Sequence, residues 1–330
     1  MRTRALALLL LAARVGADSS AGAAFLRIGD GARPLALGGA YTAASGSVDS
    51  LYYNPAGLAM LNGKELSLTH SDWLQGTSFD VASYGQATAY GTFGVSALRL
   101  GGTQEGRDAL RQKTGDFTTQ DIAAVFSYSK AVGTWLGAGA NVKYLHSQIA
   151  SDNASTYAVD AGAVARVPDS PLSFGAAILN IGEGFRFMNQ ADRLPLTIAA
   201  GAVYTPVERL NVSLDVKHEP YGHFSELDMG GEYTIGIFSF RAGYVAPVQG
   251  VDTTLQATEC IRGGLGLQIS RYRADYTLAP FGDLGLTQRF TFGILFGAGA
   301  SDSSQPHNLQ SHSQARLLDL DPALIDVTLQ

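Results

Sequence analysis

Strict alternation of apolar and polar side chains constrains this chain more than any other feature. In the stretch "RLNVSLDVKHE", Leu210, Val212, Leu214 and Val216 alternate with polar residues. A period of two residues is typical of a β-strand whose two faces meet different surroundings. The pattern recurs from about residue 64 to residue 297, and it predicts an all-β protein with about fourteen strands.

The predicted strands are joined by connections whose lengths alternate along the chain. The strands are predicted over residues 64–71, 78–88, 91–100, 121–131, 135–147, 155–167, 171–180, 195–206, 209–219, 225–235, 237–246, 261–269, 271–279 and 287–297. Short turns such as "PDSP" take turns with long loops such as 101–120 and 180–195. Transmembrane β-barrels have short turns at one end and long loops at the other. The pattern therefore predicts a transmembrane antiparallel barrel of about fourteen strands with both termini in the periplasm. The strands of a soluble β-sandwich also alternate apolar and polar residues, so an exported soluble β-sandwich is an alternative fold.

The N-terminus is predicted to be an export signal. Arg2 and Arg4 precede an apolar stretch over 5–13, which is too short to span a bilayer as a helix. Small residues end at Ala17, which predicts a signal peptide over 1–17 with cleavage near that residue.

The segment 18–62 is predicted to be a hatch of short helices inside the barrel. It contains the apolar stretch "LYYNPAGLAML" at 51–61, which Asn54-Pro55 interrupts with a helix stop. So apolar a segment is not expected to lie free in the periplasm, and a barrel lumen offers it a surrounding surface. The barrel is then predicted over 63–297, and a flexible periplasmic tail over 298–330.

Charged residues of both signs fall on the predicted inward face of the strands. These lumen-facing residues are Lys143, Asp160, Arg166, Asp215, Lys217, Asp228, Glu232, Arg241, Arg262, Arg271, Arg273, Asp275 and Arg289. A network of paired charges is the simpler interpretation, and a selectivity surface for a permeant is the alternative.

The sequence contains no pattern typical of catalysis, of a cofactor or of a metal site. Its one cysteine, Cys260, has no second thiol, the six histidines lack ligand spacing, and there is no GxSxG motif. A net charge of −6 without a basic run argues against a nucleic-acid partner. We expect a non-enzymatic protein with no cofactor, no bound metal and no catalytic residue.

Two stretches resemble a known family. The segments "AGAAFLRIGDGARPLALGGAYTAASGSVDSLYYNPAGLAML" (21–61) and "YTLAPFGDLGLTQRFTFGILF" (276–296) resemble the two ends of PorV/PorQ barrels, which are similar to the FadL long-chain fatty-acid transporters. By this resemblance the hatch motif is Asn54, Pro55 and Ala56. The final hairpin motif is Pro280, Phe281, Gly282, Asp283, Leu284 and Gly285.

The resemblance implies a barrel of the bacterial outer membrane, in contact with its lipid. Its favoured implication is a component of type 9-like secretion that binds secreted protein cargo and delivers it at the cell surface. The alternative is a FadL-like transporter for hydrophobic small molecules such as long-chain fatty acids. The stretch "FRFM" at 185–188, in a long loop, suits either a ligand pocket or a bound peptide.

Overall fold

The computed structural model of the chain describes residues 23–107, 110, 112–187, 190–249, 260–280 and 285–297. The predicted signal peptide, the predicted tail and positions 281–284 of the final hairpin motif lie outside these residues. Short helices come first along the described chain: η1 (Ala24–Arg27), α1 (Ala32–Ala36), α2 (Ser50–Tyr53) and η2 (Pro55–Met60), with η3 (Leu74–Gly76) following the first strand. In these parts of the chain, no helix is both long and apolar enough to cross a membrane.

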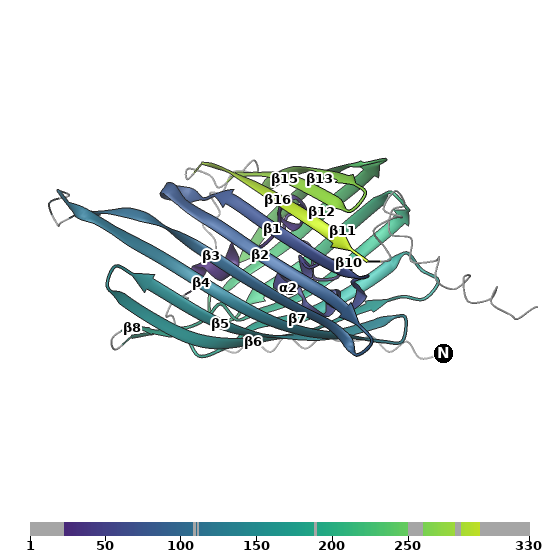
Figure 1. The fold of residues 1–330 in the computed structure, drawn as a ribbon, viewed down its shortest axis with the longest axis horizontal. Helices are drawn as coiled ribbons and strands as arrows, with labels where there is room; N and C mark the ends of the chain where they lie inside the picture. Colours follow the sequence, from purple (N-terminus) through teal and green to yellow (C-terminus); the bar gives the residue numbers. More distant parts are fainter. Residues whose placement is uncertain are drawn as a thin grey trace, which may run out of the picture.

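Fourteen strands close into one antiparallel barrel (Figure 1), which confirms the predicted fold class. They are β1 (Lys64–Asp72), β2 (Thr77–Thr88), β3 (Gly91–Arg107), β4 (Lys113–Val132), β5 (Leu136–Ile149), β6 (Asp152–Arg166), β7 (Leu172–Gly182), β10 (Thr197–Val207), β11 (Leu210–Glu219), β12 (Phe224–Ile235), β13 (Phe238–Gln249), β14 (Ile261–Ile269), β15 (Tyr272–Pro280) and β16 (Leu286–Phe296). The strands β8 (Phe185–Phe187) and β9 (Gln190–Asp192) form a separate hairpin between β7 and β10. One closed sheet excludes the β-sandwich alternative.

The predicted long loop at 101–120 is mostly strand. β3 pairs with β4 as far as Arg107 and Lys113, whereas β2 leaves β3 at Gly102 and β5 meets β4 only from Thr119. The two strands thus continue as a ribbon beyond their neighbours, at the left of Figure 1. This stretch lacks an apolar face because the ribbon covers no core, so alternation does not reveal it.

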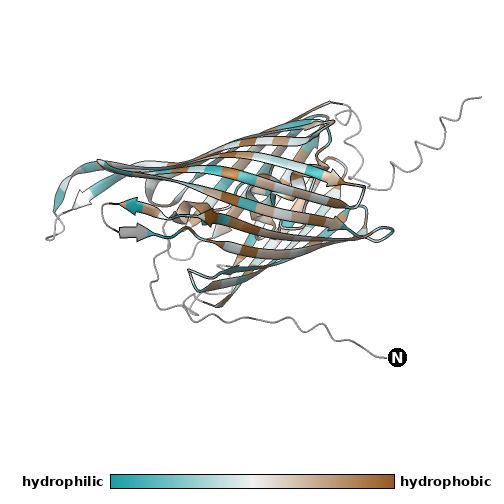
Figure 2. Cartoon of the chain, turned by 90° about the horizontal axis from the view of Figure 1, so that it is seen from below, coloured by the Kyte–Doolittle hydropathy of each residue, from teal (hydrophilic) through white to brown (hydrophobic). Residues whose placement is uncertain are grey.

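The two faces of the barrel wall differ in polarity as the alternation predicts. In β11, Ser213 and Asp215 are buried toward the lumen, whereas Val212, Leu214 and Val216 are about half exposed on the outside. Hydrophobic segments recur along the outer wall in Figure 2. An apolar outer band with a polar lumen is the arrangement that lipid requires of a barrel.

The N-terminal helices lie inside the barrel, where the purple segment of Figure 1 runs through the lumen. η2 contacts β3 to β6, and α1 contacts β13 to β16. Three apolar clusters stabilise the segment. One packs Phe25 and Leu26 against the wall at Phe79. The other two lie within the segment itself and join Val48, Leu51, Leu58 and Leu61, and Leu37, Tyr41 and Tyr53.

Candidate functional site: the hatch and the lumen

The Asn54-Pro55-Ala56 motif locks the hatch against the wall formed by β4 to β7. Asn54 is fully buried and extended, and its Oδ1 accepts the backbone N–H of Ala56 at 3.1 Å, which caps η2. Its Nδ2 donates to the carbonyl of Thr42 at 2.7 Å and to that of Ala163 in β6 at 3.1 Å. One amide side chain therefore joins two parts of the hatch to the wall.

Further contacts on the same side hold the backbone around the motif. Ser129 Oγ of β4 donates to the Pro55 carbonyl at 2.6 Å, and Asn141 Nδ2 of β5 donates to the Leu51 carbonyl at 2.8 Å. A Cβ at Gly139 would lie 2.6 Å from the Pro55 carbonyl carbon, which is too close for any larger residue without movement. Glycine at this point of the wall allows the hatch backbone to approach the strand.

Charged side chains hold the hatch on the opposite side of the lumen. Glu232 of β12 lies between Arg33 of the hatch, at 2.7 Å, and Arg241 of β13, at 2.5 Å. Arg273 of β15 pairs with Asp49 of the hatch at 3.1 Å and with Glu65 of β1, also at 3.1 Å.

Other lumen groups bind the hatch backbone. Asp215 Oδ2 accepts the backbone N–H groups of Tyr41 and Thr42 at 2.8 and 2.7 Å. Arg289 is fully buried, donates to the Gly29 carbonyl at 2.7 Å and lies 4.7 Å from the ring centre of Phe79. Because buried charges are costly unless they are paired, contacts of this kind resist displacement of the hatch.

Twelve of the thirteen charged residues predicted to face the lumen do so. Buried or half-buried in the lumen are Lys143, Asp160, Arg166, Asp215, Lys217, Asp228, Glu232, Arg241, Arg262, Arg273, Asp275 and Arg289. Some pair within the wall, as Lys217 does with Asp228 at 2.5 Å. Others bind the hatch, as Arg166 does through Ser45 at 3.0 Å. The prediction that Arg271 faces the lumen is wrong: this residue lies in the exposed β14–β15 turn beside the ring of Tyr272, because the strand begins one residue later than predicted.

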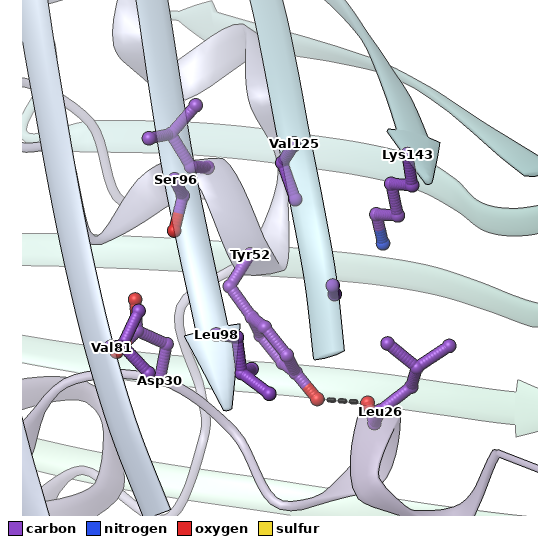
Figure 3. A pocket seen from close by; sticks show the side chains of 10 residues that line it. Leu26, Asp30, Tyr52, Val81, Ser96, Leu98, Val125 and Lys143 are labelled. Atoms are coloured by element: carbon purple, nitrogen blue, oxygen red, sulfur yellow. Dashed lines mark hydrogen bonds between the residues drawn. The ribbon is translucent and has the colours of Figure 1, made fainter. Parts of the chain in front are cut away.

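An apolar cavity lies between the hatch and the wall of β2 to β5 (Figure 3). Its apolar lining consists of Leu26, Leu51, Val81, Leu98, Ala123 and Val125. The cavity offers about 20 Å³ to the centres of water molecules, which is room for one or two waters. Any larger molecule would need the hatch or its neighbours to move.

Polar groups in the cavity wall are already bonded within the protein. The hydroxyl of Tyr52 donates to the Leu26 carbonyl, and Lys143 Nζ lies 2.8 Å from Asp160 Oδ2 and 2.8 Å from Asn180 Oδ1. The lysine is thus neutralised by a carboxylate of its own wall. These bonds leave an apolar surface as the main recognition element of the cavity.

Asp30 of the hatch also lines this cavity. Its Oδ1 accepts the backbone N–H of Gly31 at 2.6 Å. Burial raises the pKa of the Asp30 carboxyl to about 7, the nearby Asp49 carboxylate adds to the rise, and the Arg289 guanidinium opposes it. The cavity wall therefore contains a carboxyl group that titrates near neutral pH.

The β8–β9 hairpin contributes to the apolar cluster around Phe25 and Leu26. Phe185 and the nearby Leu194 are almost fully buried in it. Of the predicted "FRFM" stretch, Phe185 and Phe187 lie in this packing, and position 188 lies outside the described residues. Two aromatic residues within an otherwise polar loop are the sequence signal of this packing.

Comparison with protein families and with curated proteins gives one match. The model of an uncharacterised protein family, UPF0164, matches residues 18–163. No curated protein matches the chain. The UPF0164 match does not confirm the resemblance to the PorV/PorQ family.

Several solved structures are similar to the whole barrel. The toluene transporter TbuX of Ralstonia pickettii is 16% identical, with 82% of this chain and 99% of that chain covered and a TM-score of 0.61. The toluene transporter TodX of P. putida is 12% identical, with 81% and 99% covered and a TM-score of 0.60. A FadL homologue of Pseudomonas aeruginosa is 12% identical, with 77% and 95% covered and a TM-score of 0.53. At such low identity the likeness is one of fold, and this chain shares the barrel fold of those three proteins.

Proposed function

We propose that the protein is a barrel of the bacterial outer membrane that admits small hydrophobic molecules past its N-terminal hatch. The observation that carries the proposal is the apolar cavity between the hatch and β2 to β5, inside a barrel whose outer wall is apolar. Solved barrels of the same fold include toluene transporters and a FadL homologue, which supports transport over the secretion role that the sequence resemblance favoured.

The chemistry of the cavity favours a neutral apolar permeant. Lys143 is the basic group in the cavity lining, and it is held by Asp160 and Asn180. A carboxylate ligand would have to compete with these partners. A monoaromatic hydrocarbon or the methylene chain of a fatty acid needs only the apolar lining.

The narrow cavity supports a gated path rather than an open pore. A permeant would enter from the side of the β8–β9 hairpin, and the hatch would have to shift before it left the lumen. Mature protein is then expected in the outer membrane after cleavage near Ala17, with both termini in the periplasm.

Uptake in cells tests the proposal directly. A deletion strain should take up radiolabelled toluene or oleate more slowly than the parent, and a plasmid copy should restore the rate. Uptake of a hydrophilic sugar serves as the control and should be unchanged. Unaltered uptake of both hydrophobic probes, together with loss of proteins from the cell surface, would instead support the secretion role.

A further inference from the structure

The outer wall of β1 to β4 contains a hollow with a charged edge. We call it the outer hollow, and it is lined on the outer face by Leu68, Asp80, Ala82, Ala97, Arg99 and Ile122. Its volume is about 360 Å³. The lumen cavity described above lies on the other side of the same wall. Val81 and Leu98 contribute to the lining of both the cavity and the outer hollow.

Two alanines form the floor of the outer hollow. Ala82 of β2 and Ala97 of β3 are cross-strand partners, and Leu68 of β1 pairs with Ala82 in the same row. Leu68 is 47% exposed, as expected of an outward-facing side chain. Small side chains beside larger ones leave a depression in an apolar surface, and its shape and lining suit a hydrocarbon chain.

Charged and polar groups occupy the next row of the same strands. His70, Asp80 and Arg99 follow one another in register across β1, β2 and β3. His70 Nδ1 lies 2.6 Å from Asp80 Oδ1, and Arg99 Nη1 lies 3.6 Å from Asp80 Oδ2. All three side chains are between 42% and 58% exposed.

This outward ion pair is looser than the pairs of the lumen. The Arg99–Asp80 separation of 3.6 Å compares with 2.5 to 2.8 Å for Lys217–Asp228 and Lys143–Asp160. Ser78 Oγ also donates to Asp80 Oδ2 at 3.2 Å and accepts from Arg99 Nη1 at 3.4 Å. Because a guanidinium has five N–H donors and a carboxylate accepts up to about four hydrogen bonds, both groups still have capacity toward the outside. Charged side chains on the lipid face of a barrel are unfavourable near the midplane and tolerated near the interface, where headgroups can bind them.

We infer that the outer hollow binds a phospholipid with a zwitterionic headgroup of the phosphoethanolamine class. The acyl chain lies over Ala82 and Ala97, the phosphate accepts hydrogen bonds from the Arg99 guanidinium, and the ammonium donates to the Asp80 carboxylate. Paired charges of opposite sign match a headgroup that has both signs better than one with a single sign. The inference rests on the proposed membrane location and not on the transported molecule.

Lipid binding to the purified, delipidated full chain in detergent tests this inference. The probes are palmitoyl-oleoyl phosphatidylethanolamine, the phosphatidylglycerol with the same chains, and the matching diacylglycerol, each titrated with native mass spectrometry as the readout. We expect phosphatidylethanolamine to bind about fivefold or more tighter than either of the others, the scale of one well-placed charged contact.

Three variants separate the contributions. Arg99→Gln should weaken the binding of both phospholipids but not the binding of diacylglycerol. Asp80→Asn should remove the preference for phosphatidylethanolamine over phosphatidylglycerol. Ala97→Phe should fill the floor of the outer hollow and weaken the binding of all three lipids. Lys113→Gln is the matched control, because it breaks the exposed Lys113–Asp116 pair in the ribbon beyond the barrel.

Three results would contradict the inference or limit it. Equal affinity for the three lipids, or phospholipid binding that Arg99→Gln leaves unchanged, would overturn the inference. Slower hydrocarbon uptake in Ala97→Phe with unaltered lipid binding would also overturn it, since the hollow would then belong to the permeant's path. Fractionation is the separate check on location: a chain found in the membrane without lipid preference refutes the outer hollow alone, whereas a chain found in the soluble periplasm refutes the proposed function as well.

Discussion

Asn54 of the hatch lies so close to Gly162 of β6 that a Cβ on the glycine would collide with the Asn54 side-chain oxygen. The helix stop and the glycine are 108 positions apart in the sequence, yet each requires the other. Asn54 reaches the Ala163 carbonyl only because Gly162 leaves the wall open beside it. The hatch motif and the barrel wall are thus one fitted joint.

Gly162→Ala should loosen this joint without preventing barrel assembly. Inserting a methyl group into a close contact costs about 2 kcal/mol, which the hatch can relieve by moving. Faster cleavage of the hatch by protease in the purified protein is the expected result. Gly231→Ala is the control, because a Cβ at that position would have no neighbouring atom within 4 Å. Equal protease resistance of both variants would contradict the fitted joint.

Asn54→Ala should have a larger effect on the hatch than Gly162→Ala. The change leaves the Thr42 and Ala163 carbonyls and the Ala56 N–H without this partner, a loss of about 2 to 3 kcal/mol. Hatch mobility should rise and uptake should change, while the band of the folded barrel persists on gels of unheated samples. Disappearance of that band would show that the motif is needed for assembly itself. Asn153→Ala, at an exposed position of β6, provides the comparison.

Filling the lumen cavity should slow the passage of a hydrophobic molecule. Ala123→Phe places a ring among Leu26, Val81 and Leu98, and we expect uptake to fall about tenfold, the equivalent of about 1.4 kcal/mol. Ala124→Phe adds the same ring on the outer face of the same strand and should leave uptake unchanged. Equal uptake in the two variants would place the path elsewhere.

A reversible cross-link tests whether the hatch must move. A Cβ on Gly85 of β2 would lie 2.7 Å from Val48 Cγ1, so Cys at both positions is within reach of a disulfide. In a Cys260→Ser background, oxidation of Val48→Cys/Gly85→Cys should lower uptake about tenfold, and reductant should restore it. Each single cysteine variant is the control. Full uptake in the oxidised protein would mean that the permeant passes a stationary hatch.

The Asp30 carboxyl should make stability depend on pH. Its pKa of about 7 in the folded protein exceeds its value in the unfolded chain, so its contribution is fully present below about pH 4 and is lost as the pH rises through 7. At about 1.36 kcal/mol per pKa unit, the loss is at most about 4 kcal/mol. The free energy of unfolding in urea should therefore fall more between pH 5 and pH 8 in the wild type than in Asp30→Asn. Parallel pH profiles would show that Asp30 does not titrate in this window.

The alternation of side chains determined the barrel and the face of each strand. It is local information, because a strand between lipid and lumen must change polarity at every residue, as Leu214 and Asp215 do. Both the strand number and the inward position of most charges follow from it. Alternation did not predict the ribbon at the tips of β3 and β4, because the ribbon packs on no core. It also misplaced Arg271, because a turn removes the side chain of this residue from the lumen.

Tertiary structure alone decided how the hatch is held and where a ligand can fit. Nothing in the sequence joins Asn54 to Gly162 or Arg33 to Glu232. Closing the sheet brings these distant positions together, and backbone approach at a glycine depends on the shape of both surfaces. The sequence by itself specified a plugged barrel, whereas the fit between plug and wall exists only once the barrel has closed around it.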